Sequence, residues 1–533
     1  MFQNEWSLVW DPLRKFLEAL SYANIAAILC TVCWLSTILL QKKPGLANAP
    51  VHGYRSMFEP SLLLRARFIT GARDVIMTGY EKFKEVPFVI KCYKYDLTIL
   101  PVRYLDEVRT TPASKLDLKA IHVENVIPRY TYAQLFPDSD LHFRVVRQKL
   151  GVVKENNKYF FLARNELNFG WERDIPQSTE WIEIDIQKTM RGLIARMFAK
   201  IFLGNLVCRD ADCLQLLDEY TMDFFLTAFT LKMFPAWAHP IVARCIPARR
   251  RLKEKLDAAT RIVEPLLEKH LDALNRKNEG EKVDEEDTLL HWLIDNSTPK
   301  ENNAPAHALR ILQLTLASIH STAAGLSNVV YDLVAHPEWI PGLVEEIAQV
   351  TKELGNFDEI TDPAEAHRWL SHLEKLDSFI VEVQRHHPAM LLIPQRMALE
   401  PFTFKDGLHV PAGTRIAWAT HARVHDPEVT PNPDAFDPMR SYRKRHQDPS
   451  GMALTGHQAV TITKDHIGFG HGVQACPGRF LAVNQMKTIL MRLLTECELQ
   501  YPEGKSRPRS IYMEENAFPD PSATLMIRTK VAK

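Results

Sequence analysis

One cysteine of this 533-residue chain lies in a setting suited to chemistry. Cys476 follows closely spaced glycines in the segment FGHGVQACPGRF (469–480), and a helical pattern begins at Arg479. Glycines allow the tight backbone that can approach a flat or bulky group. The free N–H groups and the dipole at the start of a helix stabilise a thiolate. Cys476 is therefore a candidate nucleophile or metal ligand, and a buried cysteine in a glycine-rich turn is the alternative.

A carboxylate and a guanidinium lie three residues apart in Glu382-Val-Gln-Arg385, inside a helical pattern at 376–385. This spacing predicts that the two side chains share one helix face and can pair. Such a pair is common and is usually a solvated surface feature, so on its own it does not indicate a site.

Three side chains that can carry protons follow one another in a long apolar helical pattern at 307–335. They are His320, Ser321 and Thr322. An imidazole that titrates near neutral pH and two hydroxyls are suitable proton relays. The alternative is that His320 is a hydrogen-bonded core histidine and that water carries the protons.

The elements that must position these residues are predicted to be mainly helices. Apolar residues recur at three- and four-residue spacing at 186–202 and 251–274, and the pattern at 307–335 is long enough to cross a core. Short alternating runs separated by turns follow residue 395 and indicate small strands. The predicted fold class is mainly α with small β-sheets, and residues 51–533 are predicted to form one catalytic domain.

The N-terminal region contains a candidate membrane anchor. Residues 19–41 carry no charged side chain, are mostly apolar and are long enough to span a bilayer as a helix. Two lysines follow, so the positive-inside rule places residues 1–18 in the lumen, and residues 42–50 form a hinge. The alternatives are a buried helix or a cleaved signal peptide, because Ala-Asn-Ala at 47–49 resembles a cleavage site.

Composition excludes several classes of protein. Hydrophobic residues make up 46% and charged residues 24%, which excludes an intrinsically disordered chain. The 65 basic and 65 acidic residues give no formal net charge, which argues against a nucleic-acid binder. Eight scattered cysteines are too few for a disulfide scaffold and fit a body in a reducing compartment.

The cysteine segment carries a resemblance to a known family. Phe469, Gly472, Cys476 and Gly478 fit the pattern F-x-x-G-x-x-x-C-x-G, and on it the chain resembles the cytochrome P-450 family. The form HGxxACPGRF followed by Leu-Ala most resembles fungal secondary-metabolite members. The resemblance implies a mainly α haem domain behind one transmembrane helix, with the Cys476 thiolate as the axial metal ligand of haem b.

Two further haem contacts are implied by this resemblance. Gln474 stands where family members often carry an arginine or histidine against a haem propionate. Because Gln474 is uncharged, other residues must neutralise that propionate. Arg396, in the sequence Ile-Pro-Gln-Arg, resembles the propionate-binding arginine on the first strand of the small sheet.

The other two patterns match the family as well. Glu382 and Arg385 resemble its ExxR motif, and Arg440, in Phe-Asp-Pro-Met-Arg, resembles its PERF-type segment. The implied role of these three residues is a structural lock on the cysteine loop for haem uptake. Residues 317–322 resemble the A-G-x-[DE]-T-[TS] segment on the distal haem face, with serines for the glycine and the first threonine and with His320 for the acid.

The resemblance implies a monooxygenase that hydroxylates, epoxidises or further oxidises a lipophilic small molecule of terpenoid, polyketide or indole type. O2 is the co-substrate, and NADPH–cytochrome P-450 reductase supplies electrons, with cytochrome b5 as a further candidate donor. The implied location is the endoplasmic reticulum membrane, facing the cytosol, and the basic residues 443–445 are a candidate docking face. The alternatives are rearrangement, desaturation or dehydration without oxygen insertion, or a non-catalytic haem-binding membrane protein.

Overall fold

The computed structural model describes residue 46, residues 48–447 and residues 456–530. The predicted lumenal segment and anchor, with residues 42–45 and 47 of the predicted hinge, lie outside the described residues. Within the described part of the chain, no helix combines the length and apolar character that a membrane span needs.

Helices form most of the described chain, as predicted. Apolar residues at helical spacing give the long helices a face that packs into a common core. The α-helices are α3 (Ser61–Lys82), α4 (Leu105–Thr110), α5 (Lys119–Val126), α6 (Pro128–Thr131), α7 (Leu135–Asp138), α8 (Leu141–Lys149), α9 (Val153–Asp174), α10 (Ile186–Leu203), α11 (Ala211–Lys232), α12 (His239–Cys245), α13 (Pro247–Asn278), α14 (Leu289–Asp295), α15 (Ala304–Ala335), α16 (Ile340–Leu354), α17 (Pro363–Ser371), α18 (Glu374–His386), α19 (Thr420–Val424), α20 (Arg440–Gln447) and α22 (Arg479–Glu496). Short 3-10 turns are η1 (Val102–Tyr104), η2 (Ala236–Ala238), η3 (Pro337–Trp339), η4 (Phe357–Glu359) and η5 (Gly472–Gln474).

Small sheets accompany the helices, and the strands expected after residue 395 are present. The largest sheet of the described chain has six strands in the order β1-β2-β3-β9-β6-β4, so it joins the N-terminal strands to those after residue 395. A three-stranded antiparallel sheet has the order β10-β13-β5, and β11–β12 and β7–β8 form two-stranded sheets. The strands are β1 (Val51–His52), β2 (Phe88–Lys91), β3 (Asp96–Ile99), β4 (Leu116–Asp117), β5 (Ile182–Asp185), β6 (Gln395–Ala398), β7 (Phe402–Thr403), β8 (His409–Val410), β9 (Arg415–Ala417), β10 (Cys497–Gln500), β11 (Ile511–Met513), β12 (Asn516–Phe518) and β13 (Thr524–Thr529).

Helix α15 is the long helix predicted at 307–335. Its 32 residues begin three positions earlier, because the side chain of Asn303 caps the helix by accepting a hydrogen bond from Ala306 N at 3.0 Å. It ends at Ala335, just before Pro337, which cannot continue the hydrogen-bond ladder. Apolar side chains nearly all round the helix allow it to run through the core.

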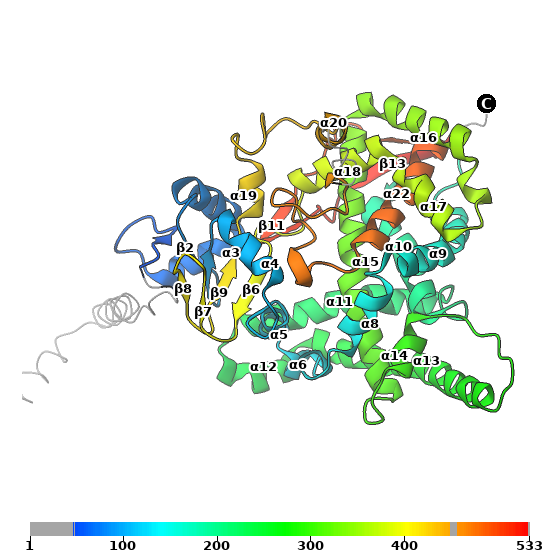
Figure 1. Ribbon diagram of the computed structural model, residues 1–533, viewed down its shortest axis with the longest axis horizontal. Coiled ribbons are helices and arrows are strands. Elements are labelled where there is room, and N and C mark those ends of the chain that lie inside the picture. The colour runs from blue at the N-terminus through cyan, green and yellow to red at the C-terminus, as the bar shows by residue number, and fades with distance from the viewer. Residues whose placement is uncertain (1–45, 47, 448–455, 531–533) are drawn as a thin grey trace, which may run out of the picture.

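The fold brings the cysteine segment and the predicted proton relay onto neighbouring elements. In Figure 1 the six-stranded sheet lies on the left with α3, α4 and α5, and the helical body with α9, α10 and α15 lies on the right. Helix α22, which follows the cysteine segment, packs against α15, the helix of the predicted proton relay. The fold therefore places the cysteine segment, which precedes α22, close to the core helix α15.

Candidate functional site

Glycines shape the loop that carries Cys476. Gly472 has a φ of +68°, and a Cβ at this position would lie 2.2 Å from the main-chain oxygen of Arg109 at the end of α4. A side chain at residue 472 is therefore excluded by both backbone conformation and contact. The loop closes on itself, because Cys476 N donates to Phe469 O at 2.8 Å, and Phe469 packs against the main core.

Cys476 is an exposed residue, but protein atoms surround its thiol on most sides. This desolvation raises the pKa of Cys476, and the N–H groups of Gly478 and Arg479 oppose the rise. A raised pKa disfavours a free nucleophile, which needs the thiolate at neutral pH. Exposure argues against an inert buried cysteine. A thiol that loses its proton when a cation binds is the function this geometry suits best.

A buried cation that forms no ion pair with the described residues lies beside this loop. Arg396 of β6 is 2% exposed, and its guanidinium donates to Gln395 O at 2.7 Å and to His471 O at 3.0 Å. Among the residues that the structure describes, its buried Nε atom has no hydrogen-bond partner, nor do the ring nitrogens of His471. Burial lowers the pKa of Arg396 to about 10. The unmatched charge and donors suit an anionic group such as a carboxylate of a cofactor, so the residues present fit a haem propionate.

Gln474 binds main chain through both polar atoms of its side-chain amide. Its Oε1 atom accepts from Leu118 N at 2.9 Å, and its Nε2 atom donates to Leu116 O at 2.7 Å. These bonds hold the cysteine loop to the segment between β4 and α5. Gln474 therefore clamps the loop, because an uncharged amide satisfies two main-chain groups at once, and its contact with the cofactor stays a prediction.

The three residues of the predicted proton relay are separated. His320 Nε2 lies 3.1 Å from the main-chain oxygen of Asp218 on α11, and burial lowers the pKa of this imidazole against the opposing charge of Asp218. Ser321 is exposed and donates from Oγ to Ala317 O at 3.0 Å, whereas Thr322 is buried. Adjacent residues on a helix point about 100° apart, which is why the three do not converge.

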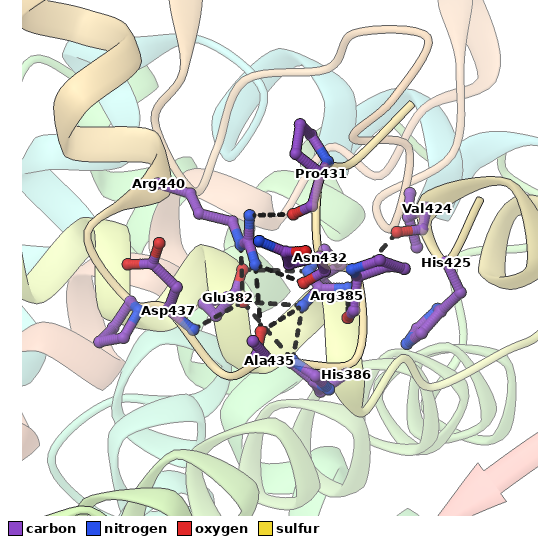
Figure 2. A network of polar contacts seen from close by, with 12 residues as sticks. Glu382, Arg385, His386, Val424, His425, Pro431, Asn432, Ala435, Asp437 and Arg440 are labelled. Atoms are coloured by element: carbon purple, nitrogen blue, oxygen red, sulfur yellow. Dashed lines mark hydrogen bonds and ion pairs between the residues drawn. The ribbon is translucent and has the colours of Figure 1, made fainter. Parts of the chain in front are cut away.

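The carboxylate of Glu382 is the centre of a buried polar network (Figure 2). Arg385 binds it with two hydrogen bonds, Nε to Oε2 at 3.0 Å and Nη2 to Oε1 at 2.7 Å. Arg440 Nε donates to Oε1 at 3.2 Å, and Asp437 N donates to the same oxygen at 3.0 Å. The three predicted residues thus meet, as the motif implied, and the pair is not a solvated surface feature.

The same network fixes the loop before α20. Figure 2 shows both guanidinium groups among the main-chain oxygens of this loop. Arg385 donates to Pro433 O at 2.7 Å, and Arg440 donates to Pro431 O and Asn432 O, each at 2.7 Å. Burial alone would raise the pKa of Glu382, but hydrogen bonds from His386 and Arg385 and the arginine charge lower it to about 2.

The basic residues 443–445 do not form one docking surface. Arg445 is 2% exposed and contacts the carboxylate of Asp377, so it belongs to the interior. Arg443 is paired with Asp437. Arg445 is therefore not part of a basic face, whereas Arg443 and Lys444 are exposed on the same helix.

A different basic surface lies beside the cysteine loop. A cavity of about 310 Å³ is lined by Arg109 of α4, Arg147 of α8, Arg479 of α22 and the loop residues Gly472 and Val473. Among the described residues, Arg109 and Arg147 have no ion-pair partner, and both are exposed. The sequence held no signal for this surface, because its arginines are single residues from distant segments.

One group of residues elsewhere has the composition of a metal site. In the described chain His270, Glu285 and His291 bring three ligand atoms within 4.8 Å of one another. The two imidazole rings are stacked with an interplanar angle of 5°, so one ion cannot lie in both ring planes. Both nitrogens of His270 are also occupied, by Glu285 at 2.7 Å and Asp295 at 2.8 Å. These contacts give the group a structural role.

Comparison with known proteins identifies the family. The family model "Cytochrome P450" matches residues 166–526. "Cytochrome P450 monooxygenase ATR4" of Stachybotrys chlorohalonatus is 42% identical over 96% of each chain. "Cytochrome P450 monooxygenase sdnB" of Sordaria araneosa is 34% identical over 100% of this chain and 97% of that protein, and "Ent-kaurene oxidase P450-4" of Gibberella fujikuroi is 34% identical over 96% and 97%.

The solved structures agree on the fold. The structure titled "Crystal structure of cytochrome P450DA heme domain" superposes with a TM-score of 0.64 and 15% identity, over 91% of this chain and 98% of that chain. The cysteine loop, the buried carboxylate network and these similarities lead to one conclusion. The chain belongs to the cytochrome P450 family and is a monooxygenase of the fungal secondary-metabolism type.

Proposed function

We propose that Cys476 binds the iron of haem b as a thiolate and that the enzyme oxidises a lipophilic small molecule with O2 and electrons from NADPH. The observation that carries this proposal is the exposed residue Cys476 at the start of α22, in a loop that Gly472 holds against α4. When bound, haem supplies the activation of dioxygen and the oxidising chemistry. The protein supplies the ligand, the anchoring of the cofactor, the pocket and the protons.

Arg396 anchors the cofactor in this proposal. Its buried guanidinium, with one donor unpartnered, offers a charge-assisted bond to a propionate, and Gln474 secures the loop from the other side. Cys476 would hold the iron as a thiolate, because metal coordination favours loss of the Sγ proton. The network of Glu382, Arg385 and Arg440 holds the loop before α20 in place. In this proposal it does not contact the cofactor.

Ser321 is the residue to which we assign proton delivery. Its hydroxyl lies on the exposed side of α15 and can pass a proton from water through Oγ. His320 joins α15 to α11 through Asp218 in this scheme, and Thr322 packs in the core. The predicted roles of His320 and Thr322 in the relay thus give way to structural ones.

A lipophilic substrate is supported by an apolar surface on α11. Met222, Phe225 and Leu226 are exposed by 67%, 51% and 51%, respectively. They follow Asp218 at helical spacing and lie on the same face, and Asp218 contacts His320 of α15. Exposed apolar side chains gathered on one helix face suit contact with a lipophilic molecule. One relative is named for the oxidation of ent-kaurene, and we extend the substrate class to terpenoid, polyketide and indole-type lipophiles.

The electron donor docks, in this proposal, at the cavity beside the cysteine loop. Arg109, Arg147 and Arg479 give it positive charge, and its wall is the loop that holds Cys476, so the electron path is short. An acidic surface of a flavin reductase, or of cytochrome b5, would be attracted to these arginines. This surface replaces residues 443–445 as the docking face.

Membrane attachment is proposed from the apolar segment at 19–41, with the catalytic domain on the cytosolic side of the endoplasmic reticulum. Exposed apolar residues at the start of α3 and near α12 would lie against the same bilayer. They include Phe58, Leu62, Leu63, Trp237 and Ile241. A membrane flotation assay of the full chain and of a chain lacking residues 1–45 tests the two contributions separately.

The proposal is tested with purified enzyme and its reductase. The ferrous–CO complex of the wild type should show the red-shifted Soret band of a thiolate ligand, and the variant Cys476→Ala should not. NADPH and ¹⁸O₂ are then supplied with a panel of lipophiles. Labelled product supports the proposal, unlabelled product indicates rearrangement, desaturation or dehydration, and a wild type without NADPH consumption for any lipophile indicates haem binding without turnover.

A further inference from the structure

A second buried ionic cluster lies on α18, separate from the network of Glu382. Asp377 is 2% exposed, and its carboxylate contacts the guanidinium of Arg445 from α20. Its Oδ1 atom lies 2.7 Å from Lys487 Nζ of α22, and Ala459 N donates at 2.8 Å to Oδ2, the oxygen that Arg445 also contacts. One carboxylate thus joins three helices and one loop segment in the interior of the protein.

The loop segment is the part of the chain that leads into the cysteine loop, and we call residues 457–466 the strap. Arg445 donates to His457 O, from Nη2 at 2.9 Å and from Nε at 3.2 Å. At the far end of the strap, His466 Nε2 lies 2.9 Å from Gln384 Oε1 on α18. Helix α18 and its partner Arg445 therefore hold both ends of the strap.

The strap is connected in turn to the main chain of Cys476. Arg479, the first residue of α22, donates from Nε to Val460 O at 3.1 Å and from Nη1 to Cys476 O at 2.8 Å. A continuous set of contacts therefore runs from the Asp377 carboxylate through the strap and Arg479 to the residue that we assign as the iron ligand.

We infer that Asp377 is a positioning residue for the thiolate, acting through the strap and through α22. Its bond to Ala459 fixes the strap, and its ion pair with Lys487 fixes the helix that begins behind Cys476. Glu382 holds a different segment, residues 431–440, so the two carboxylates of α18 serve different parts of the same site. This inference rests on the proposed function, because it takes Cys476 as the iron ligand.

The physical reason is the cost of leaving this cluster incomplete. Without the Asp377 charge, the buried cations Arg445 and Lys487 lose their shared counterion, and each gains by moving toward water. Either movement shifts the strap or α22, and both are bonded to the cysteine loop. Residues that orient metal ligands without touching the metal typically change metal affinity by about 10- to 100-fold when removed.

The test compares Asp377→Asn with a matched control elsewhere. Asp223 is also a buried aspartate between an arginine and a lysine, with Arg251 Nε at 2.9 Å and Lys255 Nζ at 2.6 Å, but these partners lie on α13, away from the strap. Asp223→Asn therefore also removes the shared charge of a buried aspartate, without a path to Cys476. Both variants are measured as haem-loaded protein, for the fraction of red-shifted ferrous–CO complex and for the thermal midpoint.

Asp377→Asn should lower the ratio of red-shifted to unshifted ferrous–CO complex by about tenfold, whereas Asp223→Asn should lower the thermal midpoint and keep the wild-type ratio. An unchanged ratio in Asp377→Asn, or an equal loss in both variants, would overturn the inference. If Asp377→Asn gives no haem-loaded protein, the milder Lys487→Gln decides in the same assay: a lowered ratio supports the role, and the wild-type ratio rejects it. A wild type without the red-shifted band would reject the proposed function instead.

Discussion

Replacement of Glu382 by glutamine is the sharpest perturbation of this site. The side chain keeps its size and one carbonyl oxygen but loses the charge that binds Arg385 and Arg440. Because Glu382 is 3% exposed, solvent cannot replace the lost interaction. We expect Glu382→Gln to be strongly destabilised and to bind haem poorly, and Glu382→Ala to be recovered without haem.

The magnitude follows from the pKa of Glu382. Its value of about 2, against an ordinary 4.5, means that the folded protein favours the ionised form. At about 1.36 kcal/mol for each pH unit, this difference corresponds to about 3 kcal/mol of folding free energy. Loss of one partner from a buried ion pair costs about 3–5 kcal/mol by a separate argument. The two figures agree, so a loss of about 3–5 kcal/mol is expected.

The pH dependence has a definite sign. The folded pKa of Glu382 is depressed, so its contribution to stability is complete above pH 4.5 and is lost as the pH falls through about 2. Between pH 5 and pH 8 the difference in unfolding free energy between wild type and Glu382→Gln should therefore be constant.

Equilibrium unfolding in urea, with haem content measured on the same samples, provides the assay. Asp257→Asn, which removes an exposed ion pair with Lys253, is the control and should change the unfolding free energy by less than about 1 kcal/mol. A Glu382→Gln enzyme that unfolds like the wild type and shows a normal ferrous–CO spectrum would refute the assigned role.

Three further predictions concern other parts of the molecule. Gly472→Ala should lose haem, measured by absorbance, because a Cβ would collide with Arg109 O at 2.2 Å; normal haem content would contradict the loop geometry. Ser321→Ala should raise peroxide release per NADPH consumed, whereas unchanged coupling would indicate that water alone carries the protons. Burial lowers the pKa of His421 to about 2, from an ordinary 6.5, so protons bind the unfolded chain first and stability falls as the pH drops below 6.5. His421→Phe should flatten the dependence of unfolding free energy on pH between 6.5 and 5 by about 1 kcal/mol per pH unit on average, and an unchanged slope would show that another group titrates.

The sequence predicted those features whose partners lie close together in the chain or in a fixed pattern. The loop of Cys476 was predictable because glycines and a following helix are local properties. The pairing of Glu382 with Arg385 was predictable because a spacing of three fixes their geometry on a helix. The long helix α15 was predictable because its apolar character extends over 32 residues.

Burial of single polar residues was not predictable in this way. Arg445 stands in a basic run and reads as a surface residue, yet its partner Asp377 is 68 residues away and only the packing of α18 against α20 brings them together. The basic cavity of Arg109 and Arg147 escaped prediction for the same reason. A run of charged residues predicts a charged surface only where all residues of the run are exposed.

Gln474 shows that the role of a residue does not follow from its position in a motif alone. Family members often carry a charged residue at position 474, which implied a contact with the cofactor. The uncharged glutamine implied that this contact is weaker here. The two bonds from Gln474 to Leu116 and Leu118 instead hold the loop to neighbouring main chain, and neither bond needs a charge.

We expect Gln474→Ala to loosen the loop and lower haem retention. Gln474→Glu should lose the bond to Leu116 O and keep an acceptor for Leu118 N. Because Arg396 carries the unmatched charge at this site, its removal in Arg396→Met should weaken haem binding more than either change at Gln474. The opposite order would mean that the clamp on the loop matters more for haem retention than the charge of Arg396.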